Sequence, residues 1–408
     1  MISMKLCMLA PEFLPIWGGV GSYITGLIRH LPKDIEIHVV APFREAMGKH
    51  RISSGDYDYP KYFSDNIHIH FLSRATGSFF YNAKFQLAVA KYVPTLVKKE
   101  GIDIIHSHEA YMPDILLQFR DIKVPIVTTV HTTIKGQREG TKRSGMGLWE
   151  LDASERATIL LYPLLRLAEE VYFAKNRYYI TVSNWMKEQL LRQYPRIRNR
   201  RIYVVYNALD TEFWSPSKEE TGKLEKENIV LYVGRLLALK GINVLIRAIP
   251  KVLKENRNVK FVFIGPGNRE VYMNMLRETG VPRPNYAFLG YRNREELLRY
   301  YRISNIFVIP SYSENMPMTL LEAMSCALPV ISTRVGGIPE VVSDYVDGIL
   351  VTPGSVDELA SSLILLLQDE NLRRSLGLNA RKKIMEKFSW NKAIHRILGI
   401  YREIMEGS

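Results

Sequence analysis

Short apolar runs alternate with amphipathic segments along almost the whole chain, in two sets separated by a polar stretch. The first set predicts strands at residues 5–9, 36–41, 67–72, 102–106, 126–131 and 178–182, and the second at 229–233, 260–264, 286–289, 306–309, 330–332 and 348–351. This βαβ rhythm is typical of parallel sheets covered by helices. Residues 215–228 lack apolar periodicity and are predicted to be a linker or surface loop. The sequence therefore predicts an α/β fold with two doubly wound, Rossmann-like domains, which bind ligands at the carboxyl ends of their strands.

Length and composition agree with this expectation. A chain of 408 residues is long enough for two domains of ~100–200 residues each. Its 47% hydrophobic and 24% charged residues are typical of a globular protein, and no run approaches the ~18 apolar residues of a membrane-spanning helix. Because residues 1–5 lead into a strand pattern instead of a signal sequence, we expect a cytoplasmic protein. Cys7 and Cys326 lie in apolar runs and are expected to be reduced and buried.

The chain has a net charge of +13, and its basic residues include two clusters. One contains Arg192, Arg196, Arg198, Arg200 and Arg201, and the other Lys135, Arg138, Lys142 and Arg143. Neither cluster lies in a nucleic-acid-binding motif, so no nucleic-acid partner is expected. The clusters are interpreted as solvated surface, or as peripheral contacts with anionic lipid at the inner membrane face or with anionic acceptors.

The segment from Ser311 to Glu322 sets two acidic residues across the predicted start of a helix. Pro317 is expected at the first helical position, where a proline loses no hydrogen bond. The helix is predicted from apolar residues at helical spacing, namely Leu320, Leu321, Met324 and Ala327. Glu314 is therefore predicted to lie in the preceding loop and Glu322 within the helix.

The start of this helix is also a predicted anion site. Its free backbone amides would point out of the helix end, where the helix dipole favours a phosphate. These amides are expected around Asn315, Met316, Met318 and Thr319. A loop carboxylate, a phosphate-binding helix end and a second carboxylate in the helix suit the recognition of a sugar nucleotide.

Two basic residues follow the first predicted strand of the second domain, at the ligand end of that sheet. They are Arg235, in Val233-Gly234-Arg235, and Lys240, in Lys240-Gly241. Both are predicted to reach a diphosphate, since charge-assisted hydrogen bonds contribute ~1.5–3 kcal/mol each.

Two glycine-rich turns are weaker indications of a ligand-binding site than the segments described above. Gly18, Gly19 and Gly21 precede a helix expected to begin near Ser22, so the backbone there can approach a ligand closely. Neither this turn nor the one at residues 265–267 completes the Gly-x-Gly-x-x-Gly dinucleotide pattern. A tight turn without a ligand remains the alternative for each.

Several motifs together resemble those of the retaining glycosyltransferases of family 4. They are Val-Gly-Arg at 233–235 with Lys240-Gly241, the Glu-x7-Glu pair at 314 and 322, Val-Gly-Gly-Ile-Pro-Glu at 335–340, and Val-Tyr-Asn-Ala-Leu-Asp at 205–210. The resemblance covers nearly the whole chain and implies the GT-B fold, with two facing Rossmann-like domains and an interdomain cleft. It implies an acceptor-side domain at 1–207, a nucleotide-sugar-binding domain at 208–388, and a C-terminal crossover helix at 389–408, beginning near Phe388-Ser389-Trp390.

The resemblance also implies roles for individual residues. Arg235 and Lys240 would hold the diphosphate and stabilise the charge of the leaving group. Glu314 would contact the donor sugar, and His131 would face the transferred sugar. The donor-binding residues would be Gly18, Gly19, Asn315, Met316, Met318, Thr319 and Glu322, the last at the ribose hydroxyls. His106 and His108 lie in a predicted strand and just after it, where packed core histidines are as common as functional ones, and only His108 is considered as an acceptor contact.

No metal site and no cofactor are expected. Asp56 and Asp58 form an Asp-x-Asp pair, but no strand end or further ligand supports them. Fixed cations and a helix end can neutralise a departing diphosphate without a metal ion. The donor substrate would be a UDP-, GDP- or ADP-sugar, and the family implies transfer with retention of the anomeric configuration.

The predicted function is transfer of a hexose from a nucleotide-diphosphate sugar to a hydroxyl acceptor. A nucleotide-sugar epimerase of the same fold and a non-catalytic sugar-nucleotide-binding protein remain alternatives. A glycosidase fits less well, because the diphosphate-binding cations would then have no role. Glycogen and starch synthases, which are relatives, carry a lysine where this chain has Ile16, so a lipid-linked or small soluble acceptor is favoured. The neighbouring Pro15 and Trp17 give this loop an apolar character that suits a lipid or a sugar face.

Overall fold

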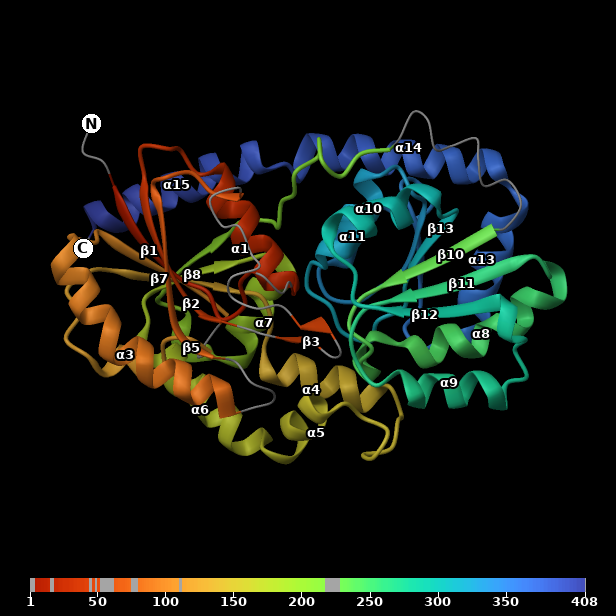
Figure 1. Cartoon of the computed structure of the whole chain (residues 1–408), viewed down its shortest axis with the longest axis horizontal. Helices are drawn as coiled ribbons and strands as arrows, with labels where there is room; N and C mark the ends of the chain where they lie inside the picture. Colours follow the sequence, from red (N-terminus) through yellow and green to blue (C-terminus); the bar gives the residue numbers. More distant parts are fainter. Residues whose placement is uncertain are drawn as a thin grey trace. The chain divides into compact units, whose positions relative to one another are not determined.

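The structure is a computed structural model that describes residues 4–14, 18–43, 46–47, 50–51, 62–74, 80–109, 112–216 and 228–407. Contacts divide the chain into two compact units (Figure 1). The first unit consists of Met1–Lys135, Leu160–Ala208 and Trp390–Ser408, and the second of Gly136–Ile159 and Leu209–Ser389. Each unit is therefore assembled from segments that are far apart in the sequence.

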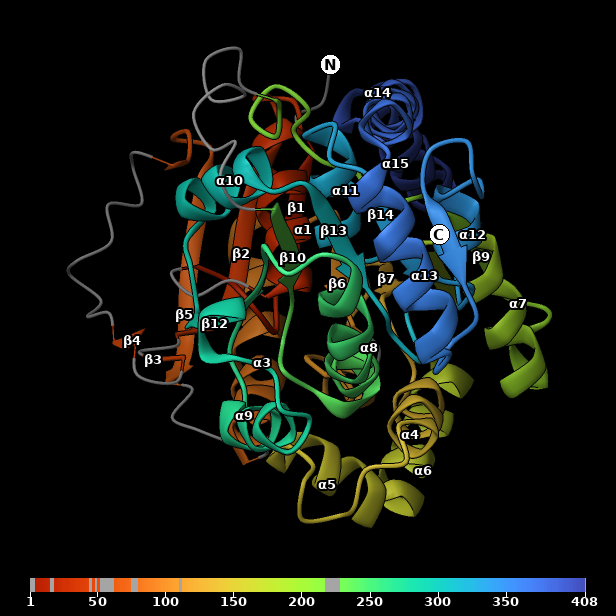
Figure 2. The same ribbon diagram turned by 90° about the vertical axis from the view of Figure 1, so that its right-hand side faces the viewer.

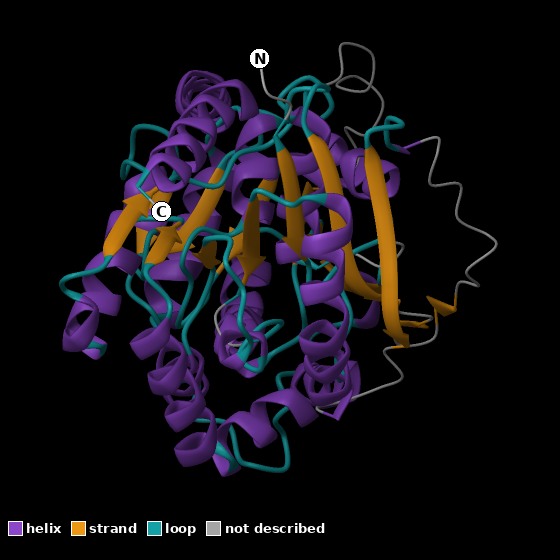
Figure 3. Cartoon of the chain, turned by 90° about the vertical axis from the view of Figure 1, so that its left-hand side faces the viewer, coloured by secondary structure: helices purple, strands orange, loops and turns teal. Residues whose placement is uncertain are grey.

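The first unit is built on a seven-stranded sheet in the order β5-β2-β1-β6-β7-β8-β9, in which all these neighbours pair in parallel (Figure 3). The order reverses at β1, so the loops after β1 and β6 diverge at a topological switch point. The strands are β1 (Lys5–Leu9), β2 (Glu36–Phe43), β5 (Ile67–Arg74), β6 (Ile104–His108), β7 (Ile126–Val130), β8 (Tyr178–Thr181) and β9 (Arg201–Val204). A separate antiparallel pair is formed by β3 (Ala46–Met47) and β4 (His50–Arg51).

Helices bury the apolar side chains of this sheet in two clusters. In one, Phe85 and Val89 of α3 pack on Cys7 and Val40, and in the other α6 and α7 pack around Tyr179. The helices that begin in this unit are α1 (Gly19–His30), α3 (Phe80–Glu100), α4 (Ile134–Arg143), α6 (Tyr162–Lys175), α7 (Asn184–Gln193) and α15 (Trp390–Glu406), with short 3-10 turns η1 (Leu117–Phe119) and η2 (Pro195–Ile197). Most of α4 and of α5 (Ala153–Leu160) belongs to the second unit.

The second unit is built on a six-stranded parallel sheet in the order β12-β11-β10-β13-β14-β15. Counted from its own first strand, this is the 3-2-1-4-5-6 order of a Rossmann sheet, whose switch point lies between β10 and β13. The strands are β10 (Asn228–Val233), β11 (Val259–Ile264), β12 (Tyr286–Gly290), β13 (Ile306–Ile309), β14 (Val330–Thr333) and β15 (Ile349–Val351).

One large core holds the helices on this sheet. Helix α8 buries most of its residues and packs beside α13, as Figure 2 shows. Such a broad apolar face stabilises a helix through packing more than through its intrinsic propensity. The helices are α8 (Ile242–Glu255), α9 (Arg269–Glu278), α10 (Arg294–Ile303), α11 (Met318–Ser325), α12 (Ile338–Val341), α13 (Val356–Gln368) and α14 (Glu370–Lys387), with 3-10 turns η4 (Ala238–Lys240) and η5 (Arg283–Asn285).

The α/β class and the two parallel sheets confirm the predicted fold class, with local corrections. Strand β6 begins at Ile104, because Ile102 donates its backbone N–H to the Val97 carbonyl and so ends helix α3. Helix α1 begins at Gly19, three residues before the predicted start, and Pro317 caps α11 from outside. Strand β9 was not predicted.

Some predictions concern residues outside the described part of the chain. These are Pro15, Ile16 and Trp17, Asp56 and Asp58, and most of the linker at 215–228. Both cysteines are free and buried, as predicted. Among the described helices, none combines the length and apolar character needed to cross a membrane.

Candidate active site

The loop after β10 carries Lys240 to the switch point of the second sheet. Lys240 ends the 3-10 turn η4, and Gly241 follows in the left-handed conformation with a φ of 69°. A side chain at Gly241 would collide with the carbonyl of Pro310, which follows β13. Because only glycine fits there, the loops after β10 and β13 can approach each other closely.

Glu314, in the loop after β13, contacts Lys240 directly. Its Oε1 lies 2.6 Å from the Lys240 ammonium and accepts a hydrogen bond of 2.9 Å from the Ser311 hydroxyl. The Glu314 side chain is 7% exposed and that of Lys240 is 23% exposed. The backbone N–H of Tyr312 donates to the Leu239 carbonyl at 2.8 Å. The structure therefore brings together two of the predicted catalytic residues as an ion pair.

The loop after β14 packs against the loop that carries Glu314. Gly336 has a φ of 59°, and its backbone lies against the carbonyl of Glu314 so closely that no side chain fits between them. The Thr333 hydroxyl donates to the Ser311 carbonyl at 2.6 Å. The Val-Gly-Gly-Ile-Pro-Glu motif thus holds the backbone of the Glu314 loop.

Helix α11 follows this loop and places Glu322 in a buried position. The side chain accepts a hydrogen bond of 2.9 Å from the Tyr301 hydroxyl. Burial raises the pKa of Glu322 to about 7, although the bond from Tyr301 acts in the opposite direction. The predicted amide donors lie around the same helix start: Asn315, Met316 and Met318 are buried, and Thr319 is partly exposed.

Arg235 points to a different part of the second unit. Its side chain is 53% exposed, and its guanidinium donates to the Ser154 hydroxyl at 3.2 Å and lies 3.9 Å from the Asp152 carboxylate. Ser154 and Asp152 belong to Gly136–Ile159, the segment that joins the second unit from the N-terminal half of the chain.

Glu155 attaches that segment to the loop after β10. Its buried carboxylate accepts hydrogen bonds from the backbone N–H groups of Ala238 and Leu239, at 3.1 and 3.0 Å, and from the Thr141 hydroxyl at 3.1 Å. Sequence reasoning did not identify Glu155, because a glutamate in an amphipathic segment gives no sign of a partner more than 80 residues away.

The first unit has its own group of predicted site residues. His131 follows β7, and its ring lies 5.0 Å from Tyr23 and 5.8 Å from His108, measured between ring centroids. Burial lowers the pKa of His131 to about 3, so its imidazole is neutral. Gly18 caps helix α1, and a side chain there would collide with the Glu12 carboxylate, whereas Gly19 faces open space.

The two histidines of β6 differ in their environment. His106 lies 2.6 Å from the Tyr401 hydroxyl and 2.7 Å from the Thr129 hydroxyl, so both of its ring nitrogens have partners within the protein. His108 is fully buried, and neither of its ring nitrogens has a hydrogen-bond partner among the described residues. A buried imidazole without partners is uncommon in folded proteins, and His108 stays a predicted acceptor contact.

Glu109, immediately after β6, is a further residue that sequence reasoning missed. It adopts a φ of 67°, a left-handed conformation that is uncommon for residues other than glycine. Its buried carboxylate accepts a bond of 3.3 Å from the backbone N–H of Thr132, and burial raises its pKa well above the ordinary value. Backbone strain of this kind leaves no trace in a sequence.

In the basic cluster between Arg192 and Arg201, several side chains form ion pairs or hydrogen bonds within the protein. Arg192 pairs with Glu188 at 3.3 Å, Arg201 pairs with Glu403 at 3.0 Å, and the Arg200 guanidinium donates to a backbone carbonyl. These contacts reduce the charge available to an external partner. Contact of the cluster with a membrane stays a prediction.

Known protein families and individual proteins resemble this chain over most of its length. A model of Glycosyltransferase Family 4 matches residues 17–213, and a model of Glycosyl transferases group 1 matches residues 215–383. An uncharacterized glycosyltransferase of Methanocaldococcus jannaschii is 29% identical, covering 99% of this chain and 99% of that protein. N-acetyl-alpha-D-glucosaminyl L-malate synthase of Bacillus anthracis is 28% identical, covering 83% of this chain and 85% of that protein.

Solved structures share the fold. The sucrose-phosphate synthase of Thermosynechococcus elongatus has a TM-score of 0.78 at 20% identity, covering 99% of this chain and 100% of that one. Anabaena HepE in complex with UDP-glucose has a TM-score of 0.73 at 18% identity, covering 98% of this chain and 100% of that one. With its two Rossmann-like sheets and matches to both family models, the chain is a GT-B glycosyltransferase of family 4, group 1.

Proposed function

We propose that this glycosyltransferase moves a hexose from a nucleoside-diphosphate sugar to a hydroxyl acceptor, with retention of configuration and without a metal ion. The observation that carries the proposal is the Lys240–Glu314 pair at the switch point of the second sheet, 2.6 Å between ammonium and carboxylate. Ligands of doubly wound sheets bind at such points. The loops at this point carry a cation and a helix start, which suit the diphosphate of a sugar nucleotide. They also carry a carboxylate, which suits its sugar hydroxyls.

The leaving group determines what the cations must do. During transfer the bond between the anomeric carbon and the phosphate oxygen breaks, and negative charge develops on the diphosphate. Lys240 neutralises that charge, assisted by the backbone amides near Asn315 and Thr319. Arg235 is proposed to join Lys240 by turning its half-exposed side chain from Ser154 and Asp152 toward the diphosphate. In same-face attack, the departing phosphate oxygen lies beside the acceptor hydroxyl and takes its proton as the new bond forms.

The ion pair also suggests a role for Glu314 in donor binding. Its carboxylate neutralises the Lys240 ammonium. When the donor binds, its phosphate replaces Glu314 as the partner of Lys240, and the carboxylate becomes free to accept hydrogen bonds from sugar hydroxyls. Glu322 accepts hydrogen bonds from the ribose in the same complex.

The nucleotide is proposed as UDP, GDP or ADP, and the structure of HepE with UDP-glucose supports UDP as the first choice to test. The acceptor is proposed as a small soluble or lipid-linked hydroxyl compound, with His108 as a contact. Gly18 and Gly19 are proposed to contact the donor, and His131 to face the transferred sugar. The name of the malate synthase relative supports a small acceptor. A thermal-shift screen over the three nucleotides and their sugars identifies the donor, because a ligand that binds the native state raises its stability.

The proposal is tested by incubating the protein with labelled donors and a panel of acceptors. Arg235→Ala and Lys240→Ala are expected to lower turnover at least about tenfold, because each removes a charge-assisted bond to the leaving group. The matched control is Lys251→Ala, which removes an exposed lysine of α8 that pairs with Asp357 at the surface.

The outcomes separate the candidate functions. A new glycosidic product that depends on Lys240 supports transfer. Release of free nucleotide without any acceptor supports an epimerase, and binding without turnover across the panel supports a sugar-nucleotide sensor. A Lys240→Ala variant as active as the Lys251→Ala control contradicts the assigned site.

A further inference from the structure

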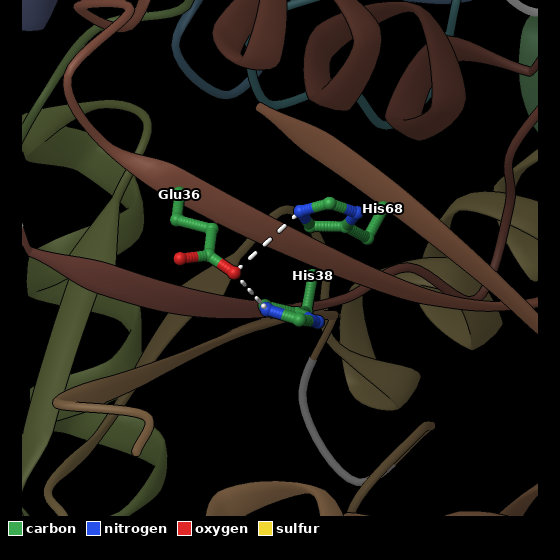
Figure 4. Close-up of side chains that lie close together, drawn as sticks. All are labelled: Glu36, His38 and His68. Carbon is green, nitrogen blue, oxygen red and sulfur yellow. Dashed lines mark hydrogen bonds and ion pairs between the residues drawn. The ribbon is translucent and has the colours of Figure 1, made fainter. Parts of the chain in front are cut away.

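Two neighbouring strands of the first sheet place a carboxylate and two imidazoles on one face. Glu36 and His38 are two residues apart on β2, so their side chains point to the same side of the sheet. His68, on the edge strand β5, is the register partner of His38. Figure 4 shows both rings turned toward the Glu36 carboxylate.

The ligand atoms of these residues are close to the spacing of a zinc site. Glu36 Oε1 lies 3.1 Å from His38 Nε2 and 3.5 Å from His68 Nε2, and all three atoms lie within 4.8 Å of one another. In a tetrahedral zinc site with bonds of about 2.0–2.1 Å, neighbouring ligand atoms are about 3.3 Å apart. The two measured distances lie on either side of that value, and the exposed ring of His68 has room to adjust.

A chain of hydrogen bonds orients the buried ligand. His38 Nδ1 lies 3.1 Å from His70 Nε2, and His70 Nδ1 lies 2.9 Å from the Tyr92 hydroxyl. With a metal on Nε2 of His38, its Nδ1–H donates to His70, and the Nδ1–H of His70 donates to Tyr92. Metal-binding histidines in proteins characteristically have an outer partner of this kind.

We propose that Glu36, His38 and His68 bind a divalent transition-metal ion of the zinc class at the edge of the first sheet. Two neutral imidazoles and one carboxylate suit zinc and its neighbours better than calcium or magnesium, which prefer oxygen ligands. The side chains of His68 and Glu36 are 44% and 28% exposed, so water completes the coordination. The ion ties the edge strand β5 to β2.

This site is separate from the proposed transfer chemistry. Glu36 and His68 stand at the N-terminal ends of their strands, whereas His108 and His131 lie at or just after the carboxyl ends of β6 and β7. All these strands are parallel, so the two groups lie toward opposite ends of the same sheet. The metal is therefore expected to stabilise the first unit and not to take part in glycosyl transfer.

Lys5 sets the strength of the site. Its ammonium lies 2.8 Å from Glu36 Oε2, the carboxylate oxygen that does not face the histidines. That positive charge opposes a bound dication at short range. Lys5→Met is expected to raise zinc affinity about fivefold at low ionic strength.

The test uses the full chain, freed of metal by dialysis against chelator and titrated with zinc chloride in a calorimeter. The unaltered chain is expected to bind one zinc ion, and His68→Ala to bind it more than about tenfold more weakly. His395→Ala is the matched control, because it removes another exposed histidine of the same unit. Titration with cobalt chloride adds a second measurement, since two nitrogen ligands in a low-coordinate site give intense visible absorption.

Three results would overturn the proposal. They are no stoichiometric zinc binding by the unaltered chain, equal affinity of His68→Ala and His395→Ala, and no gain in affinity for Lys5→Met. Thermal unfolding in chelator controls for folding, because His68→Ala should melt with the unaltered chain when no metal is present. A zinc-dependent rise in melting temperature that His68→Ala loses supports the site independently of enzymatic activity.

Discussion

At the scale of single residues, the buried carboxyl group of Glu322 makes nucleotide binding sensitive to pH. Its pKa of about 7 means that it is largely protonated below neutrality. Ribose hydroxyls donate best to the ionised form, so the affinity for nucleotide should fall by up to about tenfold per pH unit below 7.

Glu322→Gln provides the control for this prediction. The amide has no charge to lose, so the variant should bind nucleotide more weakly at pH 8 and retain only the pH dependence of the phosphates themselves. Calorimetric affinities of both proteins from pH 5.5 to 8 give the comparison. A ratio of affinities that stays constant across that range contradicts the ribose assignment.

Gly336 carries a second prediction at this scale. Gly336→Ala forces a side chain into a left-handed backbone and against the carbonyl of Glu314. Gly280→Ala is the matched control, because Gly280 has a φ of 70° but nothing within 4 Å of an added side chain. Backbone strain should lower the free energy of unfolding of both variants by ~1–2 kcal/mol. The collision with the Glu314 carbonyl should lower that of Gly336→Ala by about 1–3 kcal/mol more. Denaturant unfolding measures the difference, and equal losses would mean that the contact with Glu314 is unimportant.

The residues of the candidate site were predictable to different degrees. Glu314 and Lys240 are predicted from motifs and from their places after strands, and the structure brings them together as an ion pair. Glu155 and Glu109 are not predicted from the sequence, because the contact of Glu155 joins distant segments and the feature of Glu109 is its backbone conformation. A single sequence does not record either property.

At the scale of elements, the segment Gly136–Ile159 depends on one carboxylate for its attachment to the loop after β10. Glu155→Ala leaves the backbone N–H groups of Ala238 and Leu239 without their buried acceptor. We expect a loss of about 2–4 kcal/mol in the free energy of unfolding, together with lower turnover because the Lys240 loop shifts.

Glu150→Ala is the control for this prediction. Glu150 lies in the same segment, but its carboxylate accepts from Gly147 at an exposed position, so its loss should stay within about 0.5 kcal/mol. Urea unfolding followed by circular dichroism measures both variants. Similar stability of the two would show that Glu155 does not hold the segment.

Most elements of the fold were predictable, and the exceptions have physical causes. The predicted runs matched strands because a parallel sheet covered on both faces needs continuous apolar segments. Strand β9 was not predicted from the sequence. It lies at the sheet edge and is only partly buried, so its sequence Arg-Ile-Tyr-Val is not a long apolar run. Ile102 is predicted to lie in a strand, because an isoleucine that follows a helix end cannot be told apart in the sequence from the first isoleucine of a strand.

At the scale of the whole molecule, transfer and metal binding should respond independently to chelation. We expect EDTA to leave the rate of glycosyl transfer within about twofold, because Lys240 and Arg235 provide the positive charge that a metal would otherwise supply. The melting temperature should fall in EDTA if zinc occupies the site at Glu36. A rate that requires added magnesium or manganese would contradict the metal-free mechanism.

The route of the chain has a consequence for how the protein is made. Trp390, at the start of α15, packs on Gly26 and stacks with His30, and Tyr401 reaches the buried His106 of β6. His106 is synthesised 295 residues before Tyr401, and Gly26 and His30 are synthesised earlier still. The first unit can therefore complete its core only after α15 has been synthesised, and until then the apolar surface that α15 covers is exposed to aggregation.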